Sequence, residues 1–190
     1  YADYRPRPEN FNVPGDGKFD QDFAPSELEL AVGRVDLSNM PAFQKSETAL
    51  LKQYLLKDHE YRTASGRFFT PPRPRVVVTN LLTQWLGGVS FTSDAVERFA
   101  PSVGLSSFVM LDAARIGYEL HKLTDRDDAL WSINDDTAFF RGQYHIATTA
   151  QLAANQSLKI PFYSLFGSFF GDWEISDNYL RAPLCTSGYG

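Results

Sequence analysis

The stretch Arg75-Val76-Val77-Val78-Thr79-Asn80 decides the fold. Its β-branched side chains follow one another instead of alternating with polar ones, which is typical of a strand buried on both faces of a parallel sheet. Parallel strands need long crossover connections, and these are usually helices. The stretch therefore predicts further strands separated by helices.

Candidate strands and helices alternate on both sides of this stretch. We expect the strands of one sheet at residues 30–35, 76–79, 108–111, 129–133 and 160–166. We expect helices at residues 46–62, 93–99, 113–123 and 148–154. Strands that alternate with helices in this way predict an α/β fold with a mainly parallel sheet and flanking helices.

The clearest helix is predicted at residues 46–62. Ser46 is an N-cap residue type, Glu47 suits the positive end of a helix, and apolar residues recur at helical spacing after them. We expect this helix to pack against a face of the sheet. For the helix at residues 93–99, Ser93 or Asp94 is the expected cap.

Composition limits the classes of protein to which the chain can belong. Its 190 residues are 43% hydrophobic, enough for one substantial core, and its net charge is −5. The acidic balance argues against a nucleic-acid partner, because phosphate binding needs a basic surface. No apolar run is long enough for a membrane span, and the single cysteine, Cys185, excludes an intrachain disulfide. We divide the chain into an N-terminal loop segment, residues 1–27, and an α/β domain, residues 28–190, and expect both to be part of a larger protein.

Two blocks resemble the gingipain-type peptidases, which are relatives of the caspases. Residues 28–35, LELAVGRV, with the acidic-capped helix after them, resemble a strand and helix of that family. Residues 159–171, followed by Asp172 and Trp173, resemble the strand and turn that carry its nucleophilic cysteine. The chain is also similar to a group of large exported bacterial proteins without a characterised activity, through the blocks at residues 15–20, 33–37 and 166–173. This resemblance implies a caspase/gingipain-like fold and an extracellular or cell-surface location.

The chain departs from that family where its catalytic dyad would lie. In gingipain-like enzymes a His ends one strand and a Cys ends the next, so that the imidazole activates the thiolate. Here the first strand end reads Asn134-Asp135-Asp136 and the second reads Phe166-Gly167-Ser168, and Cys185 lies well past the turn. We therefore expect a catalytically degenerate domain that serves as a structural or binding module within a larger polypeptide or cell-surface assembly. An intracellular α/β domain with an accidental resemblance is an alternative.

A hydrolase with a substituted nucleophile is a further alternative. Ser168 could act as nucleophile and His145 as base, with Asp172, Asp135 or Asp136 as the orienting group. The competing interpretation makes His145 an ordinary loop residue and Ser168 a turn residue.

The N-terminal segment contains a candidate calcium loop. Asn12, Asp16, Lys18 through its backbone carbonyl, and Asp20 have the oxygen-rich, glycine-centred spacing of an EF-type loop. Pro14 at the third position and Phe23 at the twelfth depart from that pattern. A solvated acidic turn is the alternative to Ca²⁺ binding.

An aromatic block follows the last predicted strand. Its rings could form a stacking surface for sugar or peptide, or they could fill the core. We favour packing, with Trp173 as the exception. The block comprises Phe162, Tyr163, Phe166, Phe169, Phe170 and Trp173.

Overall fold

The computed structural model describes residues 33–66, 73–80, 91–111, 129–154 and 158–189. The chain divides into two units, Tyr1–Val35 and Asp36–Gly190, and every helix and strand described here belongs to the second. Of the first unit only residues 33–35 are described, and they are irregular. The strand predicted at residues 30–35 is therefore wrong over its last three residues, and its first three lie outside the described residues.

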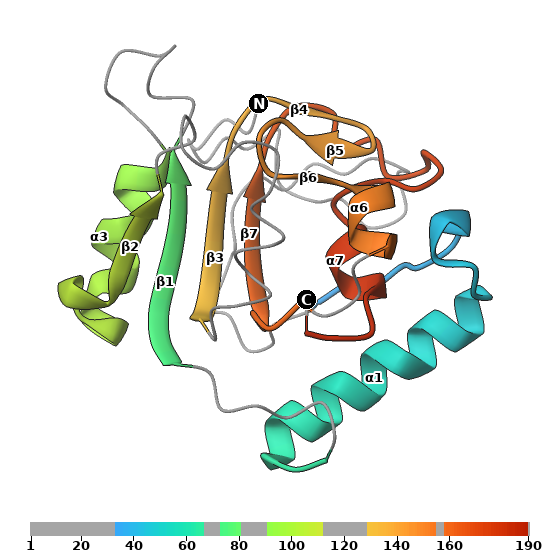
Figure 1. Cartoon of the computed structure of the whole chain (residues 1–190), viewed down its shortest axis with the longest axis horizontal. Helices are drawn as coiled ribbons and strands as arrows, with labels where there is room; N and C mark the ends of the chain where they lie inside the picture. Colours follow the sequence, from blue (N-terminus) through green and yellow to red (C-terminus); the bar gives the residue numbers. More distant parts are fainter. Residues whose placement is uncertain (1–32, 67–72, 81–90, 112–128, 155–157, 190) are drawn as a thin grey trace, which may run out of the picture. The chain divides into compact units, whose positions relative to one another are not determined.

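The main sheet has four strands, all parallel, in the order β2-β1-β3-β7 (Figure 1). This confirms the predicted α/β class and the mainly parallel pairing. The strands are β1 (Arg73–Asn80), β2 (Phe108–Leu111), β3 (Ala129–Asp135) and β7 (Phe162–Phe166). Four α-helices accompany them in the described residues: α1 (Glu47–Thr63), α3 (Phe91–Val103), α6 (Thr149–Ala154) and α7 (Ala182–Cys185).

Strand β1 is central and buried, as its β-branched run predicts. Val76 and Val78 are fully buried, and Val77 on the other face is 4% exposed. The strand pairs with β2 on one side and β3 on the other. Its register with β3 shifts between Arg73 and Val76. Pro74 lies in that interval. A proline has no N–H to donate to a regular ladder, so it is tolerated where the register is irregular.

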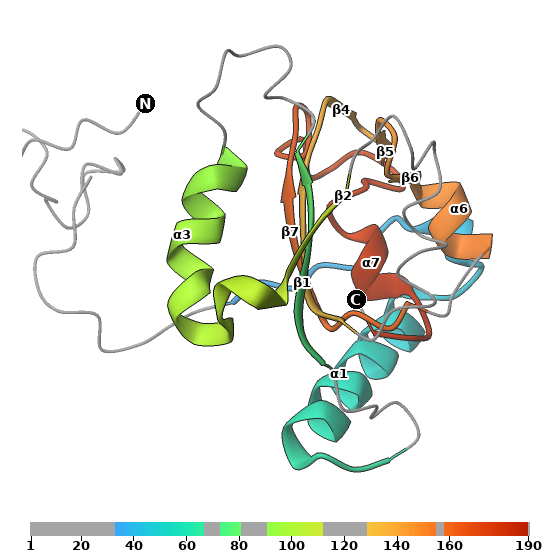
Figure 2. The same ribbon diagram turned by 60° about the vertical axis from the view of Figure 1, so that its left-hand side comes forward.

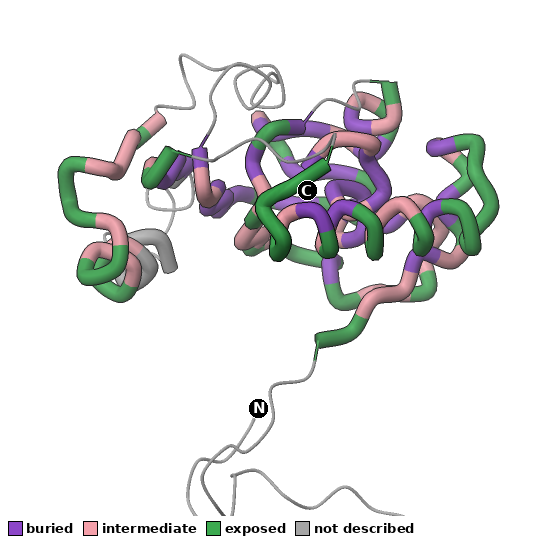
Figure 3. Tube along the Cα trace, turned by 90° about the horizontal axis from the view of Figure 1, so that it is seen from below, coloured by how far each residue is buried: buried purple, intermediate pink, exposed green. Residues whose placement is uncertain are grey.

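One face of the sheet is covered by α3. Val76, Val78 and Ile133 form the apolar centre of this face, and Phe99 of α3 lies 4.4 Å from Trp131 between ring centroids. Figure 2 shows the sheet edge-on with α3 on one side and α6 and α7 on the other. The described side chains of α3, at residues 96–103, are intermediate or exposed, whereas the purple, buried part of the trace in Figure 3 is concentrated in the rest of the fold.

The segment between β3 and β7 forms a small antiparallel sheet before the crossover helix α6. Its three strands pair in chain order, and each has only two residues. They are β4 (Ala138–Phe139), β5 (Gly142–Gln143) and β6 (Ala147–Thr148). Figure 1 shows them beyond the carboxyl ends of β3 and β7.

Helix α1 forms where predicted but does not cover the sheet. Ser46 Oγ accepts a hydrogen bond from the Ala49 N–H, which confirms the predicted N-cap. The helix packs mainly on α7, and it reaches the sheet through the Tyr61 ring, 5.4 Å from Phe162 of β7. The expected packing of α1 against a sheet face is therefore wrong.

The remaining predicted elements differ in their bounds. Helix α3 begins at Phe91, so Ser93 and Asp94 lie inside it and do not cap it. Strand β7 begins at Phe162, two residues later than predicted. The helix predicted at residues 113–123 lies outside the described residues. Within the described part of the chain, no helix has the length and apolarity needed to cross a bilayer.

Candidate functional site

The ends of β3 and β7 meet at the carboxyl edge of the main sheet. Asp135 pairs in register with Phe166, and the Asp136 N–H donates to the Phe166 carbonyl at 3.4 Å. Open α/β sheets usually bind their ligands just outside this edge. The two strand ends that the sequence singled out are therefore neighbours in space.

At this edge Asp136 holds the ring of His145. His145 Nδ1 lies 3.1 Å from Asp136 Oδ2, and the Thr137 N–H donates to Asp136 Oδ1 at 2.6 Å. The Asp136 side chain is 5% exposed, whereas that of His145 is 40% exposed. Burial raises the pKa of Asp136, and the bonds from His145 and Thr137 oppose that rise. A carboxylate fixed through both oxygens thus orients an imidazole that solvent can reach.

The loop that carries His145 is tied down on both sides. His145 has φ +53°, a left-handed conformation that few non-glycine residues adopt. The Tyr144 N–H donates to the Thr137 carbonyl at 2.8 Å, and Gln143 Nε2 donates to the Phe166 carbonyl at 2.8 Å. These bonds hold the unusual backbone of His145 in place.

Ser168 and Asp172 lie in the turn after β7. Ser168 is exposed, and the described residues give its side chain no hydrogen bond. The Asp172 N–H donates to the Phe169 carbonyl, and its own carbonyl accepts from Asn178 Nδ2. Of the three predicted orienting carboxylates, the structure brings Asp136 to His145, while the printed sequence alone could not choose among them.

Two buried amides beside this pair were missed at the sequence level. Asn134 and Gln143 are each 1% exposed. Asn134 Oδ1 accepts from Thr79 Oγ1 at 3.2 Å and from Ser132 Oγ at 3.1 Å. Within the described residues Asn134 Nδ2 and Gln143 Oε1 have no hydrogen-bond partner. The sequence signal for Asn134 was its position directly after Ile133 of the predicted strand, where a polar side chain is buried with its neighbours. Buried polar groups are usually part of a hydrogen-bond network.

Cys185 lies at the end of α7 and is fully buried. Burial raises the pKa of its thiol to about 12. A neutral, enclosed thiol is a poor nucleophile, because the thiolate is the reactive form. Cys185 therefore does not replace the missing cysteine of the strand end.

The aromatic block divides between packing and exposure. Phe170 is 5% exposed and stacks on Tyr179 at 5.6 Å, in agreement with the packing interpretation. Trp173, the predicted exception, is half-buried: its Nε1 donates to Asp36 at 2.8 Å, and the Arg181 guanidinium carbon lies 5.6 Å from its ring centroid. Trp173 therefore makes structural contacts in this fold, and the prediction that it is the exposed exception is wrong.

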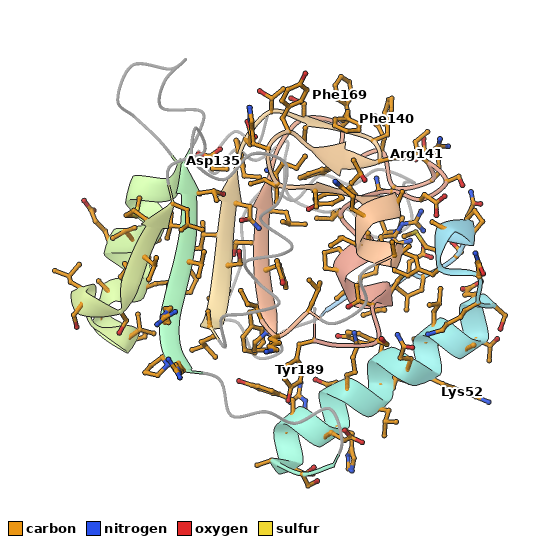
Figure 4. The ribbon with its side chains drawn as sticks, viewed as in Figure 1. Lys52, Asp135, Phe140, Arg141, Phe169 and Tyr189 are labelled. Atoms are coloured by element: carbon orange, nitrogen blue, oxygen red, sulfur yellow. The ribbon has the colours of Figure 1, made fainter. Side chains whose placement is uncertain are left out.

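Other rings of that block remain exposed beside the His145 loop. Phe169 is 54% exposed and lies 5.0 Å from Phe140 between ring centroids. Figure 4 shows these two side chains close together, with Arg141 on the same side of the fold. We call the following set the aromatic surface: Phe139, Phe140, Tyr144, Phe166 and Phe169, which are 39% to 54% exposed.

The candidate calcium loop, with Asn12, Asp16, Lys18 and Asp20, lies outside the described residues. Among those that are described, no group of three or more His, Cys, Asp or Glu side chains could hold a metal ion. The metal prediction therefore stays a prediction.

Comparisons with models of known protein families, with curated proteins and with solved structures found no match to this chain.

Proposed function

We propose that the chain is a catalytically degenerate, gingipain-like domain that acts as a binding module of an exported bacterial protein. The strand ends offer Asn134, Asp135 and Asp136 on one side and Ser168 on the other, where a His and a Cys would be needed. The adjacency of β3 and β7 supports the assignment of these two ends to one edge.

The aromatic surface is the observation that carries the binding role. Scattered exposed apolar residues are ordinary, whereas neighbouring exposed rings at a sheet edge are typical of recognition surfaces. Phe140 and Phe169 contact each other yet remain 39% and 54% exposed. Aromatic side chains offer large contact areas at a small entropic cost on binding. The partner in this proposal is the rest of a larger polypeptide or a cell-surface assembly.

A peptide library displayed on phage tests the binding role. Selection on the purified domain should enrich peptides that lose binding to a Phe140→Asp/Phe169→Asp double variant. Leu105→Asp is the matched control, because Leu105 is 73% exposed and lies in the short helix Leu105–Ser107, outside the aromatic surface. Peptides bound equally by all three proteins, or no enrichment, would contradict the proposal.

A hydrolase that uses Ser168 and His145 is a second candidate. The 3.1 Å contact between Asp136 and His145 favours it, because a carboxylate and the imidazole that it orients are two of the three members of a catalytic triad. Arg- and Lys-containing peptide substrates test it directly. Cleavage that disappears in Ser168→Ala and in His145→Ala would establish this candidate and remove the degenerate one.

A further inference from the structure

Strand β2 forms an edge of the main sheet on the side away from β7 (Figure 1). Among the described residues its only neighbour in the sheet is β1. In that part of the chain no backbone hydrogen bond reaches the outer side of β2. The N–H and C=O groups that point away from β1 are therefore a template on which another strand can pair.

This edge lacks the features that usually prevent strands from pairing. Edge strands are commonly protected by lysine, by proline or by a bulge. Residues 105–111, LSSFVML, contain no charged residue, no Pro and no Gly. The register of β2 with β1 runs without a shift from Phe108 to Leu111. A regular, uncharged and apolar edge of this kind favours pairing with a further strand.

The exposed side chains at the edge are apolar as well. Met110 is 57% exposed, and Leu105, in the short helix directly before β2, is 73% exposed. Phe108 and Met110 pair in register with Val76 and Val78, whose side chains lie on the face that α3 covers. Phe108 and Met110 therefore share that face of the sheet, because alternate residues of a strand point the same way.

We propose that β2 pairs antiparallel with β2 of a second copy of this chain, about a two-fold axis through Val109. A two-fold interface requires an edge that is complementary to itself. This register places Val109 opposite its own copy and Phe108 opposite Met110 of the second copy. Opposed side chains in an antiparallel pair lie on one face, and Phe108 and Met110 meet that condition. A methionine sulfur beside an aromatic ring is a favourable contact, and no charge lies among these pairs.

The length of β2 sets the strength of the association. The strand has four residues, and a stable interface usually buries about 800 Å² of each partner. Pairing of β2 with its copy buries less than this, even with Leu105 beside it. The dimer is therefore weak and reversible, and it forms as the concentration of the chain rises.

Sedimentation velocity over about a hundredfold range of concentration tests the association. The purified chain should shift from monomer toward dimer as the concentration rises. Met110→Lys should raise the Kd of the dimer about tenfold, because it removes both contacts between Phe108 and Met110 and adds a charge to the edge. Leu55→Lys is the matched control, because Leu55 is 54% exposed on α1 and should leave the Kd unchanged. A chain that stays monomeric throughout, or equal effects of the two lysines, would overturn the proposal.

Cysteine cross-linking tests the register. In the proposed pairing the two copies of residue 109 lie directly opposite, with Cα atoms about 4.5–5.5 Å apart, within the reach of a disulfide. The two copies of residue 110 are displaced by about 7 Å along the strands, which puts them out of reach. With copper phenanthroline as oxidant, Val109→Cys should give a disulfide-linked dimer and Met110→Cys should not. The buried Cys185 is present in both variants and makes the same background in each. Equal cross-linking of the two variants, or none in either, would contradict the pairing.

Discussion

Helices α3 and α1 flank the same fold and are attached to it by opposite chemistry. Helix α3 contacts the sheet through apolar side chains around Val76, Val78 and Ile133. Helix α1 buries Leu50 but also turns polar side chains inward. Lys57 is 4% exposed, and its Nζ donates to the carbonyls of Leu184 and Thr186 at 3.1 and 2.8 Å.

The exposed side of α1 carries apolar side chains, while a charged one is buried. Leu51, Leu55 and Leu56 are 38%, 54% and 41% exposed, whereas Glu60 is 9% exposed. Gln53 Nε2 adds hydrogen bonds to the carbonyls of Cys185 and Thr186 at the end of α7. The last carbonyls of a helix have no partner within it, and these donors satisfy them. The difference teaches that α3 is held by burial of apolar area, whereas α1 adds polar contacts with the end of a neighbouring helix to its one fully buried apolar side chain, Leu50.

The largest expected effect is on the α3 side of the sheet. Ile133→Ala removes a fully buried side chain from the apolar centre between β1, β3 and α3. We expect a loss of about 2–5 kcal/mol in the free energy of unfolding, the usual range for such truncations. Chemical denaturation measures it. Leu55→Ala on the exposed side of α1 is the control and should change stability by less than about 1 kcal/mol; equal losses would abolish the contrast between the two helices.

The sequence predicts the α3 side of the fold well and the α1 side poorly. The β-branched run Val76-Val77-Val78 buries its apolar side chains on both faces of the sheet, as a central parallel strand does, so its place follows directly from the sequence. For α1 the helix and its Ser46 cap are local properties and were predicted. Its orientation was not, because Lys57 and Glu60 are residue types normally placed in solvent.

The sequence predicted the sheet edge at which the candidate site lies, but not the contact between Asp136 and His145. The adjacent ends of β3 and β7 follow from the parallel sheet, and the sequence offered His145 as a candidate base. Its carboxylate could not be chosen, since Asp135, Asp136 and Asp172 all lie close to the two strand ends in the sequence, and only the folded loop shows which of them meets His145. The two-residue strands β4, β5 and β6 that set the position of His145 are too short to leave a periodic pattern.

The second prediction concerns Lys57 and pH. Burial lowers the pKa of Lys57 from 10.5 to about 7. Between these values the unfolded chain binds a proton that the folded chain does not, so the free energy of unfolding should rise with pH from about 7 to about 10.5. The slope from this group is at most about 1.4 kcal/mol per pH unit. Below about 7 both states are protonated and the contribution is constant.

Lys57→Met isolates this effect, because Met has a similar volume and no charge. The charged or titratable groups that act on Lys57 are Cys185 and Lys45; burial raises the pKa of the Cys185 thiol to about 12, so it stays neutral over most of this range. We expect the difference in stability between the parent and Lys57→Met to grow in favour of the parent as pH rises from 7.5 to 9.5. A pH-independent difference would mean that α1 is held by its contacts alone.

The smallest expected effect is on the start of α1. Ser46 Oγ caps the first turn by accepting from the Ala49 N–H at 3.3 Å. Because α1 packs mainly on the short α7, its own local interactions should carry more of its stability than those of α3 do. Ser46→Ala should lower the free energy of unfolding by about 1 kcal/mol, and Ser46→Asp should restore it, since aspartate is an equally good cap. Hydrogen exchange should then show faster exchange of the α1 amides in Ser46→Ala and unchanged exchange in α3. If the amides of both helices respond alike, α1 unfolds only together with the whole domain. Its polar contacts with α7 would then couple it to the fold as strongly as the apolar contacts of α3 do.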